Sequence, residues 1–194
     1  MQWHEVLLAE IEAVLARKPV SGRASAIRNS FYAQIRRLMA ETPQRSYDKI
    51  LHAGFTAAFG EHGVPINTME IDRIASSPTR VGPHPEVPHA LRRLKECYKL
   101  AIITNSDDDL IAPTVGRIGV LFDYVFTAQQ AGAYKPSLQL FEYAYRMMGV
   151  APVETVHVAM GMYTDMKTRH EMGLRAIWVN RRNEQPNSDW RPYA

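Results

Sequence analysis

The sequence predicts an α/β protein in which a helical block precedes a parallel β-sheet that carries helices on both faces. From about residue 3 to 82, apolar residues recur at helical spacing. From Gly82 onward, short apolar runs of the buried-strand type alternate with helical stretches. Strands that alternate with helices form parallel sheets covered on both faces, so the second part predicts a doubly wound core. We therefore expect a helical domain at 1–83 and an α/β core at 84–194.

The expected helices of the first domain each have one apolar face. The faces comprise Leu7, Leu8, Ile11, Val14 and Leu15; Ile27, Phe31, Ile35, Leu38 and Met39; and Ile50, Leu51, Phe55 and Phe59. Ser46 is a candidate N-cap for the third helix. A short segment around Met69, Ile71 and Ile74 predicts a fourth helix.

The core is expected to contain four buried strands with helices between them. The predicted strands are 100–104, 124–127, 156–160 and 176–180, and the predicted helices are 88–98, 109–118, 138–148 and 165–172. The polar, proline-containing tail 183–194 predicts irregular structure. With 194 residues, 46% of them hydrophobic, the chain is long enough to bury a normal core.

Composition argues against several classes of protein. The net charge is only +3 and the basic residues are scattered, which argues against nucleic-acid binding. Nothing near 18 consecutive apolar residues occurs, so no membrane span is expected. The single cysteine, Cys97, excludes intramolecular disulfides and fits a reducing cytoplasm. The first twenty residues carry three glutamates in an amphipathic pattern, which is not typical of a signal peptide.

Three segments place polar residues at the ends of predicted elements. Leu100-Ala-Ile-Ile-Thr-Asn-Ser106 ends an apolar run in Thr-Asn, Tyr134-Lys-Pro136 contains an isolated lysine, and Val156-His-Val-Ala-Met-Gly-Met-Tyr-Thr-Asp165 ends a second run in an aspartate. The pattern resembles the second, third and fourth motifs of the haloacid dehalogenase (HAD) superfamily. The order of helical block and strands resembles the type II haloacid dehalogenases, which implies a Rossmann-like core with a helical cap.

The first motif of that family, D-x-x-G-T at the end of a central strand, does not occur in these 194 residues. Neighbouring strands lie about 4.8 Å apart, so without the central strand a gap of roughly 10 Å is expected. Each unpaired backbone group buried there would cost roughly 1–3 kcal/mol. We expect the strand at 100–104 to pair directly with the strand at 156–160, or a second chain to fill the gap, and we prefer direct pairing. Exposed edges also favour a homodimer.

The resemblance assigns roles to five residues. It implies that Lys135 steadies the nucleophilic carboxylate and the anion under attack, and that Asp165 orients this lysine and water. It also implies that Thr104, Asn105 and Arg28 hold the substrate carboxylate or phosphate. From the residues alone, a strand-end turn remains an alternative interpretation of Thr104 and Asn105. Arg28 equally fits a solvated surface side chain, whereas the context Gly132-Ala-Tyr-Lys-Pro-Ser137 favours the site over a solvated lysine for Lys135.

No metal ion or other cofactor is expected. In the family's phosphatases the counterpart of Asp165 helps bind Mg²⁺ with an acidic residue five positions earlier, where this chain has Met160. Met162 stands where a polar, water-positioning side chain is common. The three aspartates at 107–109 are more typical of helix capping than of chelation, with Asp107 or Asp108 capping the helix that follows. Phe141 replaces a common tyrosine and is expected to pack.

The resemblance implies covalent hydrolysis, in which an aspartate displaces halide or accepts a phosphoryl group and water then cleaves the ester. We expect a chain of the 2-haloacid dehalogenase type that retains the scaffold and anion pocket but is catalytically impaired. Its expected ligand is a small anion, either a 2-haloacid-like carboxylate or a phosphate. Two alternatives stay open: a non-enzymatic anion-binding or interaction protein on the same scaffold, and an active hydrolase whose N-terminal segment is missing from this sequence.

Overall fold

The structure is a computed structural model that describes residues 1–20 and 22–191. Its contacts define two compact units. The first comprises Met1–Ala101 and Ser106–Asp123, and the second comprises Ile102–Asn105 and Tyr124–Ala194. Each unit is described by itself. The last three residues of the tail, for which irregular structure was expected, lie outside the described residues.

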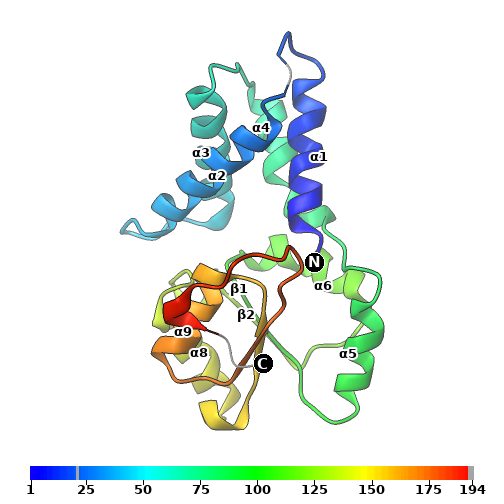
Figure 1. The fold of residues 1–194 in the computed structure, drawn as a ribbon, viewed down its shortest axis with the longest axis vertical. Helices are drawn as coiled ribbons and strands as arrows, with labels where there is room; N and C mark the ends of the chain where they lie inside the picture. Colours follow the sequence, from blue (N-terminus) through cyan, green and yellow to red (C-terminus); the bar gives the residue numbers. More distant parts are fainter. Residues whose placement is uncertain (21, 192–194) are drawn as a thin grey trace. The chain divides into compact units, whose positions relative to one another are not determined.

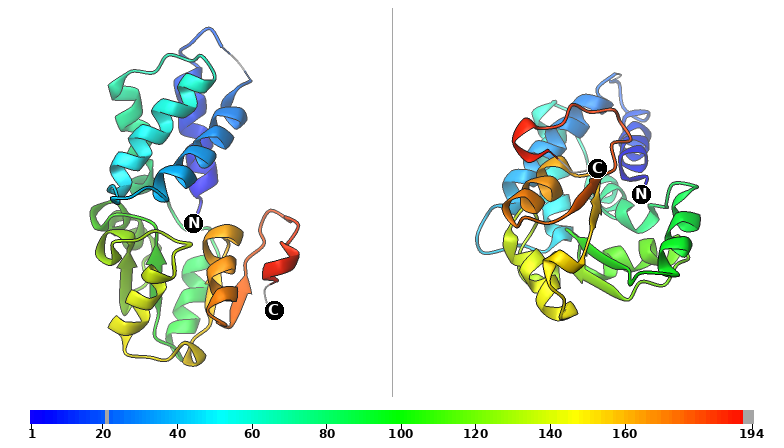
Figure 2. Two further views of the ribbon diagram at one scale, coloured as in Figure 1. Left: turned by 90° about the vertical axis from the view of Figure 1, so that its left-hand side faces the viewer. Right: turned by 60° about the horizontal axis from the view of Figure 1, so that its bottom comes forward.

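The first unit contains a bundle of four helices (Figures 1 and 2), which confirms the helical block expected from the apolar spacing. The helices are α1 (Trp3–Leu15), α2 (Ala24–Met39), α3 (Tyr47–Glu61) and α4 (Thr68–Ala75). Their predicted faces supply the core, since Leu7, Ile11, Ile27, Phe31, Ile50, Leu51, Phe55, Phe59 and Ile74 are fully buried. The rings of Phe31 and Phe55 stack with centroids 3.9 Å apart, joining α2 to α3.

Three further elements belong to this unit: the 3-10 turn η1 (Ser77–Arg80), α5 (Val87–Lys95) and α6 (Asp108–Ile118). The Thr114 hydroxyl of α6 donates to the Pro78 carbonyl at 2.6 Å. The contacts therefore group α5 and α6 with the helical bundle, and the two units do not coincide with the expected division at residue 83. That division stays a prediction, based on the change in sequence pattern.

The second unit contains the strands that the apolar runs predict. They are β1 (Ala101–Thr104), β2 (Tyr124–Thr127), β3 (His157–Ala159) and β4 (Ala176–Trp178). The first residue of β1, Ala101, is grouped with the first unit. Around them lie α7 (Ala128–Ala131), α8 (Leu138–Met148), η2 (Pro152–Glu154), η3 (Met162–Met166), α9 (Lys167–Glu171) and η4 (Ser188–Trp190). Phe141, Tyr145 and Leu174 form a buried cluster against which Ile103 and Met172 pack.

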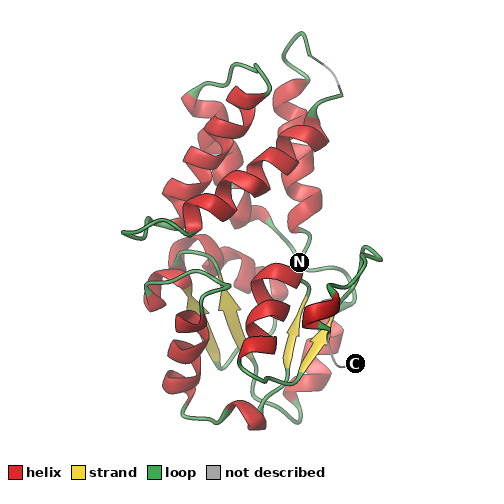
Figure 3. Cartoon of the chain, turned by 60° about the vertical axis from the view of Figure 1, so that its left-hand side comes forward, coloured by secondary structure: helices red, strands yellow, loops and turns green. Residues whose placement is uncertain are grey.

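The four strands point the same way but form two separate pairs (Figure 3). β1 pairs with β2, and β3 pairs in parallel with β4. The preferred expectation that the first and third strands pair directly is therefore wrong. Side chains occupy the space instead, because the Lys135 ammonium donates to the Ile103 carbonyl of β1 while Asp165 bridges this ammonium to His157 of β3.

One face of the β3–β4 pair is open. Val158 and Ile177 are in register, so their side chains share a face of the sheet, and they are 55% and 45% exposed. Because side chains alternate along a strand, His157 of β3 lies on the opposite face. Among the described residues, no helix is both long and apolar enough to cross a membrane.

Candidate active site

A buried ion pair links Lys135 to Asp165. The Lys135 Nζ lies 2.7 Å from Asp165 Oδ1, and the two side chains are only 11% and 7% exposed. Lys135 lies in the loop before α8, and Asp165 lies in η3, directly before α9. Thr168 of α9 links this helix to the loop that carries Lys135, since its hydroxyl donates to the Pro136 carbonyl at 2.8 Å. The structure thus brings together the two residues expected to be catalytic.

The Lys135 ammonium also reaches the end of β1. It donates to the Ile103 carbonyl at 2.9 Å, and this carbonyl belongs to the peptide bond that joins Ile103 to Thr104. An ammonium has three N–H donors. Two are used by Ile103 and Asp165, and among the described residues Lys135 Nζ has no further partner. One donor of a nearly buried cation is therefore left for an external acceptor.

Asn105 holds the backbone of Lys135 in a reciprocal contact. Its Oδ1 accepts the Lys135 N–H at 2.7 Å, and its Nδ2 donates to the Lys135 carbonyl at 3.0 Å. The side-chain amide is thus directed to the lysine backbone, and this arrangement suits a residue that positions Lys135. The expected contact of Asn105 with substrate stays a prediction.

Three donors surround the Asp165 carboxylate. Lys135 and His157 both contact Oδ1, with His157 Nε2 at 3.1 Å, while the Thr164 hydroxyl donates to Oδ2 at 2.7 Å. Burial alone would raise the pKa of the Asp165 carboxyl. The Lys135 charge and the contacts with His157 outweigh this effect and hold the pKa well below its ordinary value. Asp165 is therefore an anion whose charge is already compensated.

The turn that presents Asp165 is a π-helical one, with both Asp165 N–H and Met166 N–H donating to the Gly161 carbonyl. Such turns are rare and often occur at functional sites. Gly161 leaves room for this arrangement, because a Cβ there would overlap Thr164 Oγ1 and Asp165 Oδ2. His157, Thr164 and Gly161 were not identified from the sequence. The sequence signal that could have indicated His157 is its place as a polar residue within the apolar run 156–160.

The structure gives less information on Thr104 and Arg28, the other two residues expected to contact the substrate. Thr104 ends β1 and is half-buried beside the carbonyl that Lys135 contacts. Arg28 lies in α2 of the helical unit, where its Nε is buried and, among the described residues, has no hydrogen-bond partner. Substrate binding by both residues stays a prediction.

The site residues do not fit a magnesium ion. Mg²⁺ requires several oxygen ligands, including carboxylates. Asp165 has both oxygens engaged by donors, and the Met160 side chain supplies no oxygen. Among residues 1–20 and 22–191, no cluster of three or more His, Cys, Asp or Glu side chains could hold a metal.

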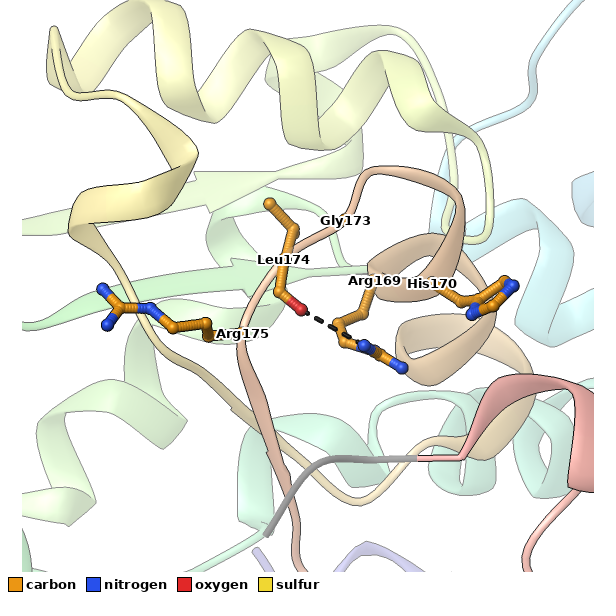
Figure 4. A pocket seen from close by; sticks show the side chains of 5 residues that line it. All are labelled: Arg169, His170, Gly173, Leu174 and Arg175. Atoms are coloured by element: carbon orange, nitrogen blue, oxygen red, sulfur yellow. Dashed lines mark hydrogen bonds between the residues drawn. The ribbon is translucent and has the colours of Figure 1, made fainter.

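A separate hollow of about 400 Å³ lies over the turn from α9 to β4 (Figure 4). It is lined by Arg169, His170, Gly173, Leu174 and Arg175. The buried Arg169 guanidinium donates to the Leu174 carbonyl at 3.3 Å and to the Arg191 carbonyl at 2.6 Å. The Arg175 side chain points away from the Arg169 side chain. Neither Lys135 nor Asp165 lines this hollow, so the hollow is separate from the candidate site.

Comparison with known proteins agrees with the fold. The family model described as haloacid dehalogenase-like hydrolase matches residues 3–159, and the chain belongs to this family of hydrolases. Among solved structures, L-2-haloacid dehalogenase PA0810 has a TM-score of 0.81 at 21% identity, covering 100% of this chain and 86% of that one. L-2-haloacid dehalogenase RSc1362 has a TM-score of 0.86 at 18% identity, covering 96% and 85%. The Rossmann-like fold with a helical cap is thereby confirmed.

Relatives by sequence include both dehalogenases and phosphatases. The chain is 24% identical over 124 residues to (S)-2-haloacid dehalogenase 4A of Burkholderia cepacia, covering 62% of this chain and 53% of the relative. It is 33% identical over 98 residues to glyceraldehyde 3-phosphate phosphatase of Methanocaldococcus jannaschii, covering 47% and 43%. The chain spans about half the length of the curated relatives that it matches.

Proposed function

We propose that this chain is a HAD-like hydrolase of the 2-haloacid dehalogenase type, with a Lys135–Asp165 site that binds the charged group of a small anion. The observation that carries the proposal is the third N–H of the Lys135 ammonium, which the described residues leave unused. A compact, nearly buried cation with a donor to spare suits a carboxylate or phosphate oxygen. Asp165 and the Ile103 carbonyl fix the direction of this donor.

A carboxylate ligand is favoured over a phosphate ester. The relatives named above include a dehalogenase for haloacids and a phosphatase for a phosphate ester. The donor set around Asp165 does not fit Mg²⁺, which the family's phosphatases use. The proposed substrate class is therefore the small 2-haloacids.

We further propose that the 194-residue polypeptide is catalytically impaired. It contains no D-x-x-G-T motif, and Asp165 is the one carboxylate that contacts Lys135 in the described part of the chain. Because both oxygens of Asp165 accept hydrogen bonds, this carboxylate is a poor substitute for a nucleophile. The alternatives are an anion-binding protein without activity and an active hydrolase that carries its nucleophile in a segment missing from this sequence.

Binding is tested by titrating the protein with 2-chloropropionate, inorganic phosphate and sulfate in a calorimeter. We expect 2-chloropropionate to bind, K135A to abolish binding, and K135R to weaken it, because the larger guanidinium cannot reproduce the bonds to Ile103 and Asp165. K167A is the matched control, since Lys167 lies in the same unit and pairs with Glu171. Equal affinities for wild type and K135A would overturn the proposed site.

Turnover is tested by halide release from 2-chloropropionate. We expect none from the 194-residue polypeptide. Adding an N-terminal strand that ends in D-x-x-G-T should restore release, whereas the same strand with Asn in place of the Asp should not. Release by the unextended chain that disappears in K135A would contradict the proposed impairment. An extended chain that binds the anion without turnover would favour the non-enzymatic alternative.

We also propose a cytoplasmic homodimer. The single cysteine supports the compartment, because Cys97 is an exposed free thiol of the kind that a reducing environment preserves. The open face of β3–β4 supports self-association.

A further inference from the structure

His157 and Lys135 meet on the same oxygen atom of Asp165. Lys135 Nζ lies 2.7 Å from Oδ1 and His157 Nε2 lies 3.1 Å from it. The histidine approaches from β3, whereas the lysine approaches from the loop before α8. The carboxylate is thereby held from two directions by parts of the chain that are separated by over twenty residues.

The surroundings of His157 fix the orientation of its ring. The side chain is only 13% exposed, and the fully buried Phe141 packs against it edge to face with ring centroids 5.2 Å apart. An ionised carboxylate can only accept hydrogen bonds, so the hydrogen lies on Nε2. His157 Nδ1 has no hydrogen-bond partner among the described residues. Phe141 therefore packs directly against the His157 ring.

We propose that His157 is a positioning residue that fixes the Asp165 carboxylate, so that the Lys135 ammonium keeps its third N–H directed at the anion. The inference rests on the proposed function for its ligand, but its geometry is independent of that ligand. Thr164 is adjacent to Asp165 in the chain and moves with the same turn. His157 is the one donor to Asp165, in the described part of the chain, that comes from a strand. Without the His157 contact, the Asp165 carboxylate could rotate about its terminal torsion, which has a broad energy minimum. The Lys135 ammonium, bound to Oδ1, would then change direction with it.

A positioning role differs from a packing role in its need for a donor. H157Q keeps an N–H donor of similar reach, whereas H157L and H157F keep apolar volume beside Phe141 and donate nothing. H170Q and H170L are the matched controls, since His170 is an exposed histidine of α9 in the same unit. Circular dichroism and urea unfolding establish which variants fold.

Two readouts are measured on the folded variants. The first is the ¹⁵N–¹H signal of the Lys135 ammonium, assigned by its loss in K135R, because a hydrogen-bonded and nearly buried ammonium exchanges slowly with water. The second is the affinity for 2-chloropropionate. We expect H157L and H157F to lose or shift the signal and to weaken binding about tenfold, in line with the loss of a hydrogen bond to a charged group. H157Q should keep the signal and bind within about threefold of wild type.

The outcomes separate this inference from the proposed function. If wild type fails to bind the anion, the proposed function fails, while the ammonium signal still decides the role of His157. If H157L and H157F retain both the signal and the affinity, the positioning role is excluded. If H157Q behaves like H157L, the donor is not what matters, and that result also overturns the inference. Should H157L fail to fold, H157F and H157Q still give the comparison.

Discussion

The carboxylate of Asp107 caps helix α3 by accepting the backbone N–H of Tyr47 at 3.0 Å. Its other oxygen accepts the N–H of Asp48, also at 3.0 Å. Ser46 occupies the N-cap position expected from the sequence, but its side chain makes no capping bond. Asp107 likewise occupies the N-cap position of α6, but its side chain makes no capping bond to that helix. The expectation that Asp107 or Asp108 caps the helix that follows is therefore wrong for the Asp107 side chain, which caps α3 instead. A capping pair so distant in sequence leaves no local pattern.

Asp107→Ala should destabilise the helical unit. It would leave two N–H groups at the start of α3 without their acceptor, in a place where Asp107 is only 4% exposed. Loss of a cap costs about 0.5–2 kcal/mol, and a buried unsatisfied donor raises that cost toward 3 kcal/mol. Urea unfolding followed by circular dichroism measures the change. The exposed Asp109→Ala should stay within about 0.5 kcal/mol, and an equal effect of both variants would contradict the capping role.

Most of the architecture could be predicted because it follows from local periodicity. The faces of α1 to α3 and the apolar runs of all four strands are visible in the sequence, and the pairing of Lys135 with Asp165 followed from the resemblance. His157 was missed because its contact depends on the π-helical turn at 162–166, which periodicity does not reveal. The separation of β1 from β3 was missed because side chains, not backbone, bridge the two strands.

Gly161→Ala should disrupt the candidate site. The added Cβ would overlap Asp165 Oδ2 and Thr164 Oγ1, and the carboxylate would have to move away from its donors. Overpacking of this kind costs about 1–3 kcal/mol, and the affinity for 2-chloropropionate should fall along with stability. Gly60→Ala is the control, because a Cβ there meets no atom within 4 Å and alanine favours a helix. Unchanged affinity in Gly161→Ala would show that the position of Asp165 is not critical.

His52 should make the helical unit more stable below neutral pH than above it. Burial lowers its pKa, but hydrogen bonds to the Asp48 carbonyl at 2.8 Å and to the Asp72 carboxylate at 3.0 Å, with the charges of both acids, raise the pKa overall. A raised folded-state pKa contributes stability that is complete below the unfolded value, about 6.5, and is lost as the pH rises through the folded value. The contribution is modest because the side chain is a third exposed.

Asp72→Asn tests this link between α3 and α4. It should lower the pKa of His52, as followed by NMR titration of the ring Cε1–H, and it should flatten the dependence of the urea midpoint on pH around neutrality. Asp109 is exposed and distant from His52 in the sequence, so Asp109→Asn should leave the His52 titration as it is in wild type. A His52 titration that is identical in Asp72→Asn and wild type would rule out the carboxylate as the cause.

Self-association should depend on the open face of the β3–β4 pair. Val158 and Ile177 lie in register there with about half of each side chain exposed, and β4 is the described hydrogen-bonded neighbour of β3. A charge on this face would have to be desolvated when two copies meet, so Val158→Lys should shift the protein toward the 22.0 kDa monomer in size-exclusion chromatography with light scattering. Leu121→Lys, at an exposed residue of the other unit, should leave the distribution unchanged. A wild-type protein that is monomeric at every concentration would exclude this face as a dimer contact.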